Sequence, residues 1–113
     1  MRICVNNPGT NWRTADGITI GTDLKNVQRI NDGPFNLAGF GWDGGGATES
    51  WQNGKLAGKG CELFLDLIPD FPESDQRKTA LSSQVMGDRP FSSANPVMQE
   101  LNPTVHRLCL FYR

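Results

Sequence analysis

The stretch that decides the predicted fold is FGWDGGG at residues 40–46, inside a β-like segment over residues 35–67. Glycine adopts backbone conformations that other residues avoid, so the three consecutive glycines predict a sharp bend between two strands. Trp42 and Trp51 lie in the same segment. The stretch therefore predicts a bent antiparallel meander that carries large aromatic side chains.

A second turn of this meander is predicted at Asn53-Gly54, in the segment WQNGKL at residues 51–56. Asn-Gly between two strand-like segments is the strongest short signal for a two-residue hairpin. Such a turn pairs Gln52 with Lys55 and sets Trp51 opposite Leu56. The predicted strands of the meander cover residues 35–42, 47–52 and 55–68.

The last strand of the meander has the clearest pattern. Cys61, Leu63, Leu65 and Leu67 alternate with Glu62, Phe64, Asp66 and Ile68. This period of two predicts that the first set faces the core. Gly58 and Gly60 are expected to bulge or bend the strand near its start.

A helix is predicted just before the meander. Thr22 is expected to cap it, and Asp23 to favour the positive end of its dipole. Its apolar stripe at helical spacing consists of Leu24, Val27 and Ile30. The segment NDGP at residues 31–34 is expected to end the helix, with glycine in the left-handed position. Ile18 and Ile20, upstream, are expected core anchors.

Further elements are predicted on both sides of this unit. Residues 2–5 form a short strand, and residues 76–81 one helical turn in an irregular loop over residues 69–83. Asn95 caps a second helix that Pro96 begins. Residues 104–112 are apolar on both faces, which indicates a central strand. The chain is therefore expected to be α+β, with an antiparallel sheet packed against one or two short helices.

The composition excludes several classes of partner. The chain has 113 residues, and we expect one domain over residues 1–113, with residues 1–13 as a peripheral segment. Its 11 basic and 12 acidic residues give a net charge of -1, without the basic excess of nucleic-acid binders. No apolar run reaches the roughly 18 residues that span a bilayer. We expect neither a nucleic-acid partner nor an integral membrane segment.

The three cysteines, Cys4, Cys61 and Cys109, lie far apart in the sequence. An odd number allows at most one internal disulfide, and the absence of a CxxC pair argues against structural zinc. Cys61 and Cys109 lie inside apolar strand patterns, which favours buried thiols. Neither a metal nor another cofactor is predicted.

Two sequence features give little support to a nucleotide site or a catalytic pair. Residues 39–44 match GxGxxG, but the nucleotide fingerprint needs a helix after the glycines, and more glycine and a hairpin follow here. His106 is the single histidine, and positions 106 and 109 of a strand point to opposite faces, so a His106–Cys109 catalytic pair is not expected.

Four carboxylates along the meander support a second hypothesis. They belong to Asp43, Glu49, Glu62 and Asp66. Two facing carboxylates could act on a sugar, as in a small hydrolase or a carbohydrate-binding protein. Their alternation with apolar residues is more simply explained by the solvent side of the sheet. A catalytic role requires that they, or His106, converge in one cleft with shifted pKa values.

The aromatic residues of the meander carry the preferred hypothesis. Phe40, Trp42 and Trp51 exceed what one hairpin of a small core usually needs. Together with Asp43 and Leu56 they are the predicted interaction patch, which is expected to bind a protein partner or a second copy of the chain. No catalytic residue is predicted.

Several segments resemble a family of uncharacterised bacterial exported proteins. They are TADGITIGTDL at 14–24, GPF at 33–35, GFGWD at 39–43, SWQNGKL at 50–56, GD at 87–88, FSSANP at 91–96 and LNPTV at 101–105. The resemblance implies a periplasmic or lipid-anchored protein whose leader has been removed, although a cytoplasmic location stays open. It implies no activity and no catalytic residues.

The predicted architecture also resembles, more distantly, the helix-plus-sheet unit of β-lactamase inhibitor proteins and outer-membrane assembly lipoproteins. Those domains bind proteins through the sheet or its edges. The triple glycine at residues 44–46 and the single clear long helix depart from that pattern. The expectation for this chain is thus a non-enzymatic, exported bacterial domain.

Overall fold

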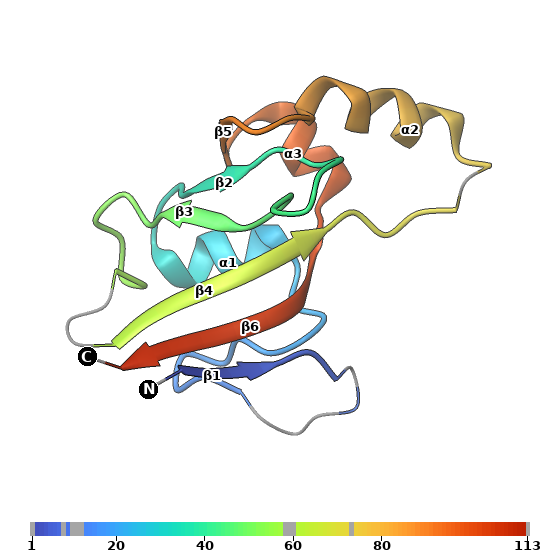
Figure 1. Ribbon diagram of the computed structural model, residues 1–113. Helices are drawn as coiled ribbons and strands as arrows, with labels where there is room; N and C mark the ends of the chain where they lie inside the picture. The colour runs from blue at the N-terminus through green and yellow to red at the C-terminus, as the bar shows by residue number, and fades with distance from the viewer. Residues whose placement is uncertain (1, 8, 10–12, 58–60, 73, 113) are drawn as a thin grey trace.

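The described residues form two small antiparallel sheets and three short α-helices (Figure 1). The computed structural model describes residues 2–7, 9, 13–57, 61–72 and 74–112. Sheet A has the strand order β1 (Arg2–Val5), β6 (Thr104–Tyr112), β4 (Cys61–Ile68), and sheet B the order β3 (Thr48–Ser50), β2 (Asn36–Ala38), β5 (Pro90–Ser92). The helices are α1 (Leu24–Asn31), α2 (Gln76–Ser82) and α3 (Pro96–Leu101), and a 3₁₀ turn, η1, covers Ser83–Val85. The predicted α+β class is confirmed.

Strand β6 is the central strand of sheet A, as its two apolar faces predicted. It pairs with β4 from Cys61↔Tyr112 to Ile68↔Thr104, with a shift in register between Asp66 and Leu67. Asp66 pairs with Arg107 and Leu67 with Val105, so His106 is the extra residue of a bulge. The bulge lets Val105 and Leu108, three positions apart, both point into the core.

The predicted meander is wrong in its third strand. β4 pairs with β6 rather than with β3, and the two sheets meet at one isolated antiparallel bridge, Ala47↔Asp66. Strands β2 and β3 have three residues each, far shorter than predicted. The chain after β3 turns towards the end of α1 and does not return along β3. The expected bend at Gly58 and Gly60 lies outside the described residues.

The turn after β3 is displaced by one residue from the predicted Asn53-Gly54. The left-handed residues are Gln52, with φ 52°, and Asn53, with φ 63°. The Gly54 N–H donates to the Trp51 carbonyl at 2.9 Å and closes the turn. Trp51 and Leu56 therefore do not face each other across a hairpin.

Three hydrogen bonds join the segment around β3 to alternate residues of β4. The Leu67 N–H donates to the Gly46 carbonyl at 2.9 Å, the Leu65 N–H donates to Thr48 Oγ1 at 3.1 Å, and Trp51 Nε1 donates to the Leu63 carbonyl at 3.0 Å. Alternate residues of a strand point their backbone groups to the same edge. These bonds thus satisfy one edge of β4 largely without a backbone ladder.

Gly46 is required at the start of this junction. Its φ is +78°, and a Cβ there would lie 1.8 Å from the Leu67 carbonyl oxygen. Only glycine allows the turn at residues 43–46, which was predicted, to approach β4 so closely.

Helix α1 is capped by Asp23 rather than by the predicted Thr22. Asp23 Oδ1 accepts from the Asn26 N–H, and Oδ2 accepts from Asn102 Nδ2, both at 2.9 Å. Burial would raise the pKa of Asp23, but these hydrogen bonds and the nearby charge of Lys25 outweigh it and lower the pKa. At the other end, the left-handed C-cap is Asp32, with φ 58°, rather than glycine.

The core lies between α1, α3 and the inner faces of the sheets. Its buried hydrophobic members are Ile18, Leu24, Val27, Phe35, Leu37, Phe40, Leu56, Leu63, Leu65, Leu67, Val85, Met98, Leu101, Val105 and Leu108. Ile20 packs against this cluster and Ile18 belongs to it, so both predicted anchors are confirmed. The buried positions 63, 65 and 67 confirm the predicted inner face of β4.

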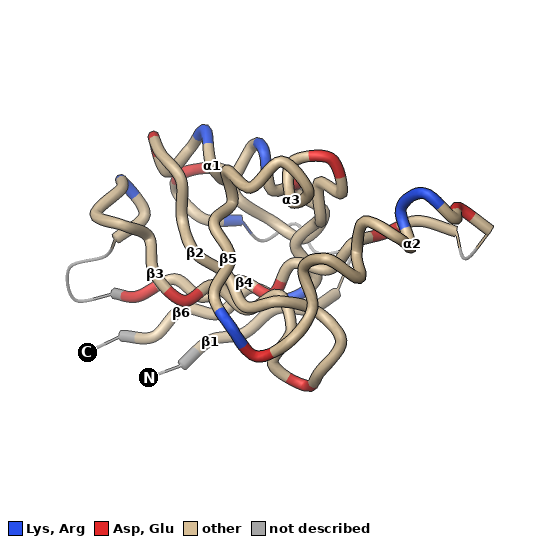
Figure 2. Tube along the Cα trace, turned by 90° about the horizontal axis from the view of Figure 1, so that it is seen from above, with Lys and Arg blue, Asp and Glu red and all other residues tan. Residues whose placement is uncertain are grey.

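The shorter helices follow their sequence signals. Asn95 caps α3 by accepting from the Val97 N–H at 2.8 Å, as predicted. α2 covers the predicted helical turn, buries no residue and projects from the rest of the molecule in both views (Figures 1 and 2). Figure 2 also shows acidic and basic residues interspersed along the described chain.

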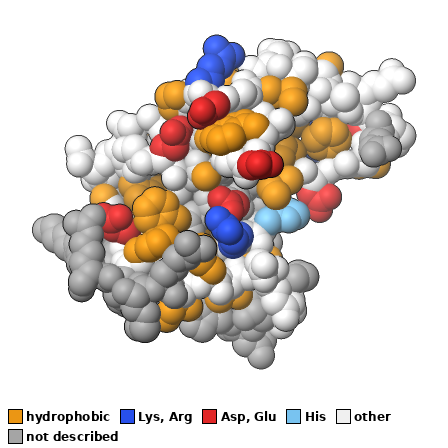
Figure 3. Space-filling model, viewed as in Figure 1, with side chains coloured by type: hydrophobic (Ala, Val, Ile, Leu, Met, Phe, Trp, Pro, Cys, Tyr) orange, Lys and Arg blue, Asp and Glu red, His pale blue; other side chains and the backbone are white. Residues whose placement is uncertain are grey.

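A disulfide joins Cys4 of β1 to Cys109 of β6, which are directly opposite in the register. The prediction of a thiol at Cys109 is therefore wrong, although its burial is confirmed. The same register places the disulfide, Phe64 and Phe111 on the outer face of sheet A, away from α1. That face is turned towards the viewer in Figure 3.

We expect Gly46→Ala to destabilise the fold far more than Gly17→Ala. Gly17 also has a positive φ, of +94°, but a Cβ there meets nothing within 4 Å. The control should lose about 1 kcal/mol from backbone strain alone, and Gly46→Ala about 4 kcal/mol or more because of the backbone clash. Urea unfolding followed by circular dichroism measures both. Equal losses would show that the junction with β4 is not close.

Reduction of the disulfide should lower the free energy of unfolding by about 4 kcal/mol, because the bridge closes a long loop in the unfolded chain. The two cysteines are 105 residues apart. Urea unfolding with and without reductant measures the change. The control is Cys61→Ser, which retains Cys4 and Cys109 and should therefore lose the same stability on reduction. An unchanged midpoint in the control protein after reduction would contradict the Cys4–Cys109 pairing.

Candidate functional site

The five residues of the predicted interaction patch differ in their exposure to solvent. Phe40 and Leu56 are 8% and 5% exposed, and both belong to the core. They cannot supply contact area, so the prediction is wrong for these two. The physical reason is that the bend at residues 40–46 turns Phe40 under the sheet, while the segment after β3 folds Leu56 inwards. Asp43 is exposed, and Trp51 is half-buried.

Trp42 is the most exposed of the predicted aromatic residues, at 42%. Its Nε1 donates to the Gly39 carbonyl at 2.9 Å. A Cβ on Gly44 would lie 2.5 Å from two carbon atoms of the indole, so the ring rests on the Gly44 backbone. The glycine turn thus holds the ring in one place and leaves part of it open to solvent.

Two further exposed hydrophobic side chains lie beside the segment at residues 40–45. Ile68, 43% exposed, lines with Trp42 an open hollow of about 430 Å³. Met86, 45% exposed, has its Cε against Gly41, and its backbone forms a bridge with Phe40. We call Trp42, Ile68 and Met86 the Trp42 surface. The strand pattern already placed Ile68 on the outer face of β4, but nothing in the sequence marked Met86.

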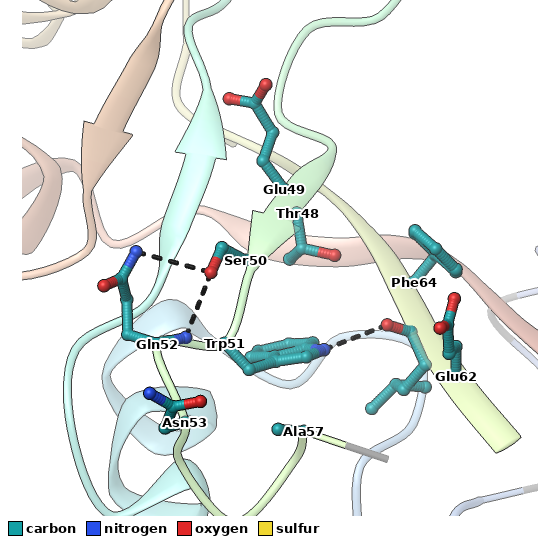
Figure 4. Close-up of a pocket in the computed structure, with 10 residues that line it drawn as sticks. Thr48, Glu49, Ser50, Trp51, Gln52, Asn53, Ala57, Glu62 and Phe64 are labelled. Carbon is teal, nitrogen blue, oxygen red and sulfur yellow. Dashed lines mark hydrogen bonds between the residues drawn. The ribbon is translucent and has the colours of Figure 1, made fainter. Parts of the chain in front are cut away.

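A second hollow, of about 270 Å³, lies along β3 and the turn that follows it (Figure 4). Its lining residues are Thr48, Glu49, Ser50, Trp51, Gln52, Asn53, Ala57, Glu62, Leu63 and Phe64. We call it the Trp51 hollow. It combines aromatic rings with hydroxyl, amide and carboxylate groups from β3, the following turn and the first half of β4.

Trp51 is fixed in the wall of this hollow by two contacts. Its Nε1 donates to the Leu63 carbonyl at 3.0 Å, the bond drawn in Figure 4. Its ring packs on Phe35 with centroids 5.0 Å apart and planes tilted by 47°. The indole therefore has a single, well-supported position.

The turn that carries Trp51 is held by the buried side chain of Asn31, at the end of α1. Asn31 Nδ2 donates to the Gly33 carbonyl at 3.0 Å and to the Trp51 carbonyl at 3.1 Å, and Oδ1 accepts from the Leu56 N–H at 3.0 Å. The Asn31 carbonyl also accepts from the Lys55 N–H at 2.8 Å. One amide thus replaces the hairpin partner that this segment lacks.

The candidate acid–base residues are distributed over several places. Asp66 forms an ion pair with Arg107, with Nε and Oδ2 2.8 Å apart. Asp43 lies at the hollow beside Trp42, and His106 lines a different hollow with Asp70. Glu49 and Glu62 share the Trp51 hollow, where Figure 4 shows them on separate strands and not directed at each other.

Residues 39–44 lead through a turn into β3 and not into a helix, so the GxGxxG match does not form a nucleotide fingerprint. Within the described part of the chain, no group of three or more His, Cys, Asp or Glu residues could hold a metal ion. Over the same residues, no helix combines the length and apolar character that a membrane crossing requires.

Comparison of the chain with protein-family models, curated proteins and solved structures found no match. The resemblance to bacterial exported proteins, and the architectural likeness to β-lactamase inhibitor proteins, therefore stay predictions. Evidence for the function therefore comes from the Trp42 surface and the Trp51 hollow.

We expect Asn31→Ala to destabilise the protein by about 3 kcal/mol, because it leaves a buried N–H and two half-buried carbonyls without this partner. The matched control is Asn26→Ala on the same helix, whose exposed side chain accepts from Arg29 and interacts with the Asp23 carboxylate. The control should change stability by about 0.5 kcal/mol or less. Urea unfolding measures both. Similar small losses in the two variants would show that Asn31 does not hold the turn.

Proposed function

We propose that this chain is a non-catalytic binding domain, exported by a bacterium, that docks a protein partner through the Trp42 surface. The observation that carries the proposal is the exposure of three apolar side chains along the segment at residues 40–45. Trp42 belongs to this segment, Ile68 shares its hollow, and Met86 packs against Gly41. Each is more than 40% exposed. Water-exposed apolar side chains that cluster in this way are typical of protein-binding surfaces.

The geometry of Trp42 suits the role of an anchor. Tryptophan is among the residues that contribute most to binding at protein interfaces. The bond to the Gly39 carbonyl and the contact with Gly44 hold its ring before any partner arrives. A ring that is already ordered loses little conformational entropy on binding, which favours affinity.

The disulfide supports the exported part of the proposal. Disulfides persist in oxidising compartments such as the bacterial periplasm and are rare in the cytosol. Cys4 and Cys109 join the edge strand of sheet A to its central strand. A bond of that kind is useful to a small domain outside the cytosol, and it fits the resemblance to exported proteins.

A photo-crosslinking amino acid at position 42 tests the proposal in living bacterial cells. We expect one defined protein adduct from position 42, and none from position 64, where exposed Phe64 lies on the outer face of sheet A. The purified partner should bind the unmodified domain at least tenfold more tightly than the Ile68→Ser, Met86→Ser double variant.

The outcomes separate partner binding from self-association. An adduct with the mass of two copies of the chain would replace the partner by a self-interface, which light scattering on dilution would then check. The absence of any adduct from position 42, or the same adducts from positions 42 and 64, would refute the Trp42 surface as the docking site.

A further inference from the structure

We propose that the Trp51 hollow binds one ring of a neutral carbohydrate, stacked against Trp51 and hydrogen-bonded by Glu49, Gln52 and Asn53. This inference concerns a surface other than the Trp42 surface and does not depend on the protein partner proposed above. The segment that carries Trp42 precedes β3, whereas the Trp51 hollow is lined by β3, the turn after it and part of β4.

The lining of the hollow matches the two chemical sides of a sugar ring. A pyranose presents C–H groups on its faces and hydroxyl groups around its edge. The indole of Trp51 and the ring of Phe64 offer apolar surface, and the remaining side chains offer donors and acceptors. The volume of about 270 Å³ lies just below the roughly 300–1,000 Å³ of pockets that hold drug-sized ligands, which suits a single ring.

The turn beside Trp51 keeps two residues in a costly conformation. Gln52 and Asn53 have φ values of 52° and 63°, a region where glycine fits better than either. Gly54 follows at once, and a turn shifted by one residue would have used it in a left-handed position. Backbone strain of this kind tends to be retained where the side chains have a function.

The side chains of this turn are poised to accept and donate hydrogen bonds. Gln52 Nε2 donates to Ser50 Oγ at 3.3 Å, which directs the amide and leaves its Oε1 as an acceptor (Figure 4). Among the described residues, the side chain of Asn53 makes no hydrogen bond and Glu49 forms no ion pair. Both are therefore available to a ligand.

The mixture of groups favours a neutral, hydroxyl-rich ligand over a charged one. The carboxylate of Glu49, which forms no ion pair among the described residues, disfavours an anion. An ammonium group has no acceptor for the amide N–H donors of Asn53, whereas a sugar hydroxyl both donates and accepts. A sugar thus satisfies the Glu49 carboxylate and the amides together.

Isothermal titration calorimetry of the whole chain tests this proposal. The probes are four neutral tetrasaccharides, cellotetraose, maltotetraose, xylotetraose and chitotetraose in its N-acetylated form, with tetralysine as a cationic comparison. We expect at least one tetrasaccharide to bind and to change the tryptophan emission. The proposal is overturned if none binds at millimolar concentration, or if tetralysine binds more tightly than every sugar.

The double variant Gln52→Gly, Asn53→Gly separates binding from folding. It removes both amides, yet glycine accepts the positive φ values, so the melting temperature should stay unchanged or rise. Sugar binding should fall at least tenfold. The matched control is Asp32→Gly, which replaces another left-handed residue that does not line this hollow and should leave sugar binding unchanged.

A double variant that is folded and binds the sugar as tightly as the unmodified chain would refute the role of the turn. Trp42→Ala should leave sugar binding unchanged, and the double variant should leave crosslinking from position 42 unchanged. Failure of the carbohydrate proposal is therefore distinguishable from failure of the protein-partner proposal.

Discussion

The structure depends on the junction between β3 and β4, where three hydrogen bonds meet alternate residues of one strand edge. The Leu67 and Leu65 N–H groups donate to Gly46 and Thr48, and Trp51 donates to the Leu63 carbonyl. Unpaired backbone groups at a sheet edge cost free energy when they are buried, and they promote aggregation when they are exposed to solvent. Here a backbone carbonyl, a hydroxyl and an indole satisfy them in turn, and so hold two small sheets against one core.

Both candidate binding surfaces are formed by segments that belong to this junction. The glycine turn before β3 must approach β4 closely at Gly46, and the same turn presents Trp42. The turn after β3 brings Trp51 to the edge of β4, and the Asn31 side chain holds this turn by donating to the Trp51 carbonyl. Supporting contacts of this kind order the side chains before a ligand arrives, which lowers the entropic cost of binding. A stable junction and ordered surfaces thus have the same physical cause.

Local sequence signals predicted where helices and strands lie better than they predicted which strands pair. The apolar alternation of β4, the cap at Asn95 and the apolar faces of β6 all depend on neighbouring residues, and each was confirmed. The pairing of β4 with β6 joins segments far apart in the chain, and no local pattern encodes it. The Asn-Gly signal failed because Asn31, twenty residues upstream, offers the segment after Trp51 better hydrogen bonds than a second strand would.

By itself, the sequence determined the α+β class, the positions of most elements and the importance of the glycine turn, because periodicity, caps and glycine act over a few residues. Only the tertiary structure decided which aromatic residues are exposed. Phe40 and Trp42 are two residues apart in one strand-like stretch, yet one is in the core and the other is open. It also decided that Cys4 and Cys109 are paired and that Met86 lies beside Phe40 and Gly41. These are long-range contacts, fixed by how the sheets pack rather than by any local preference.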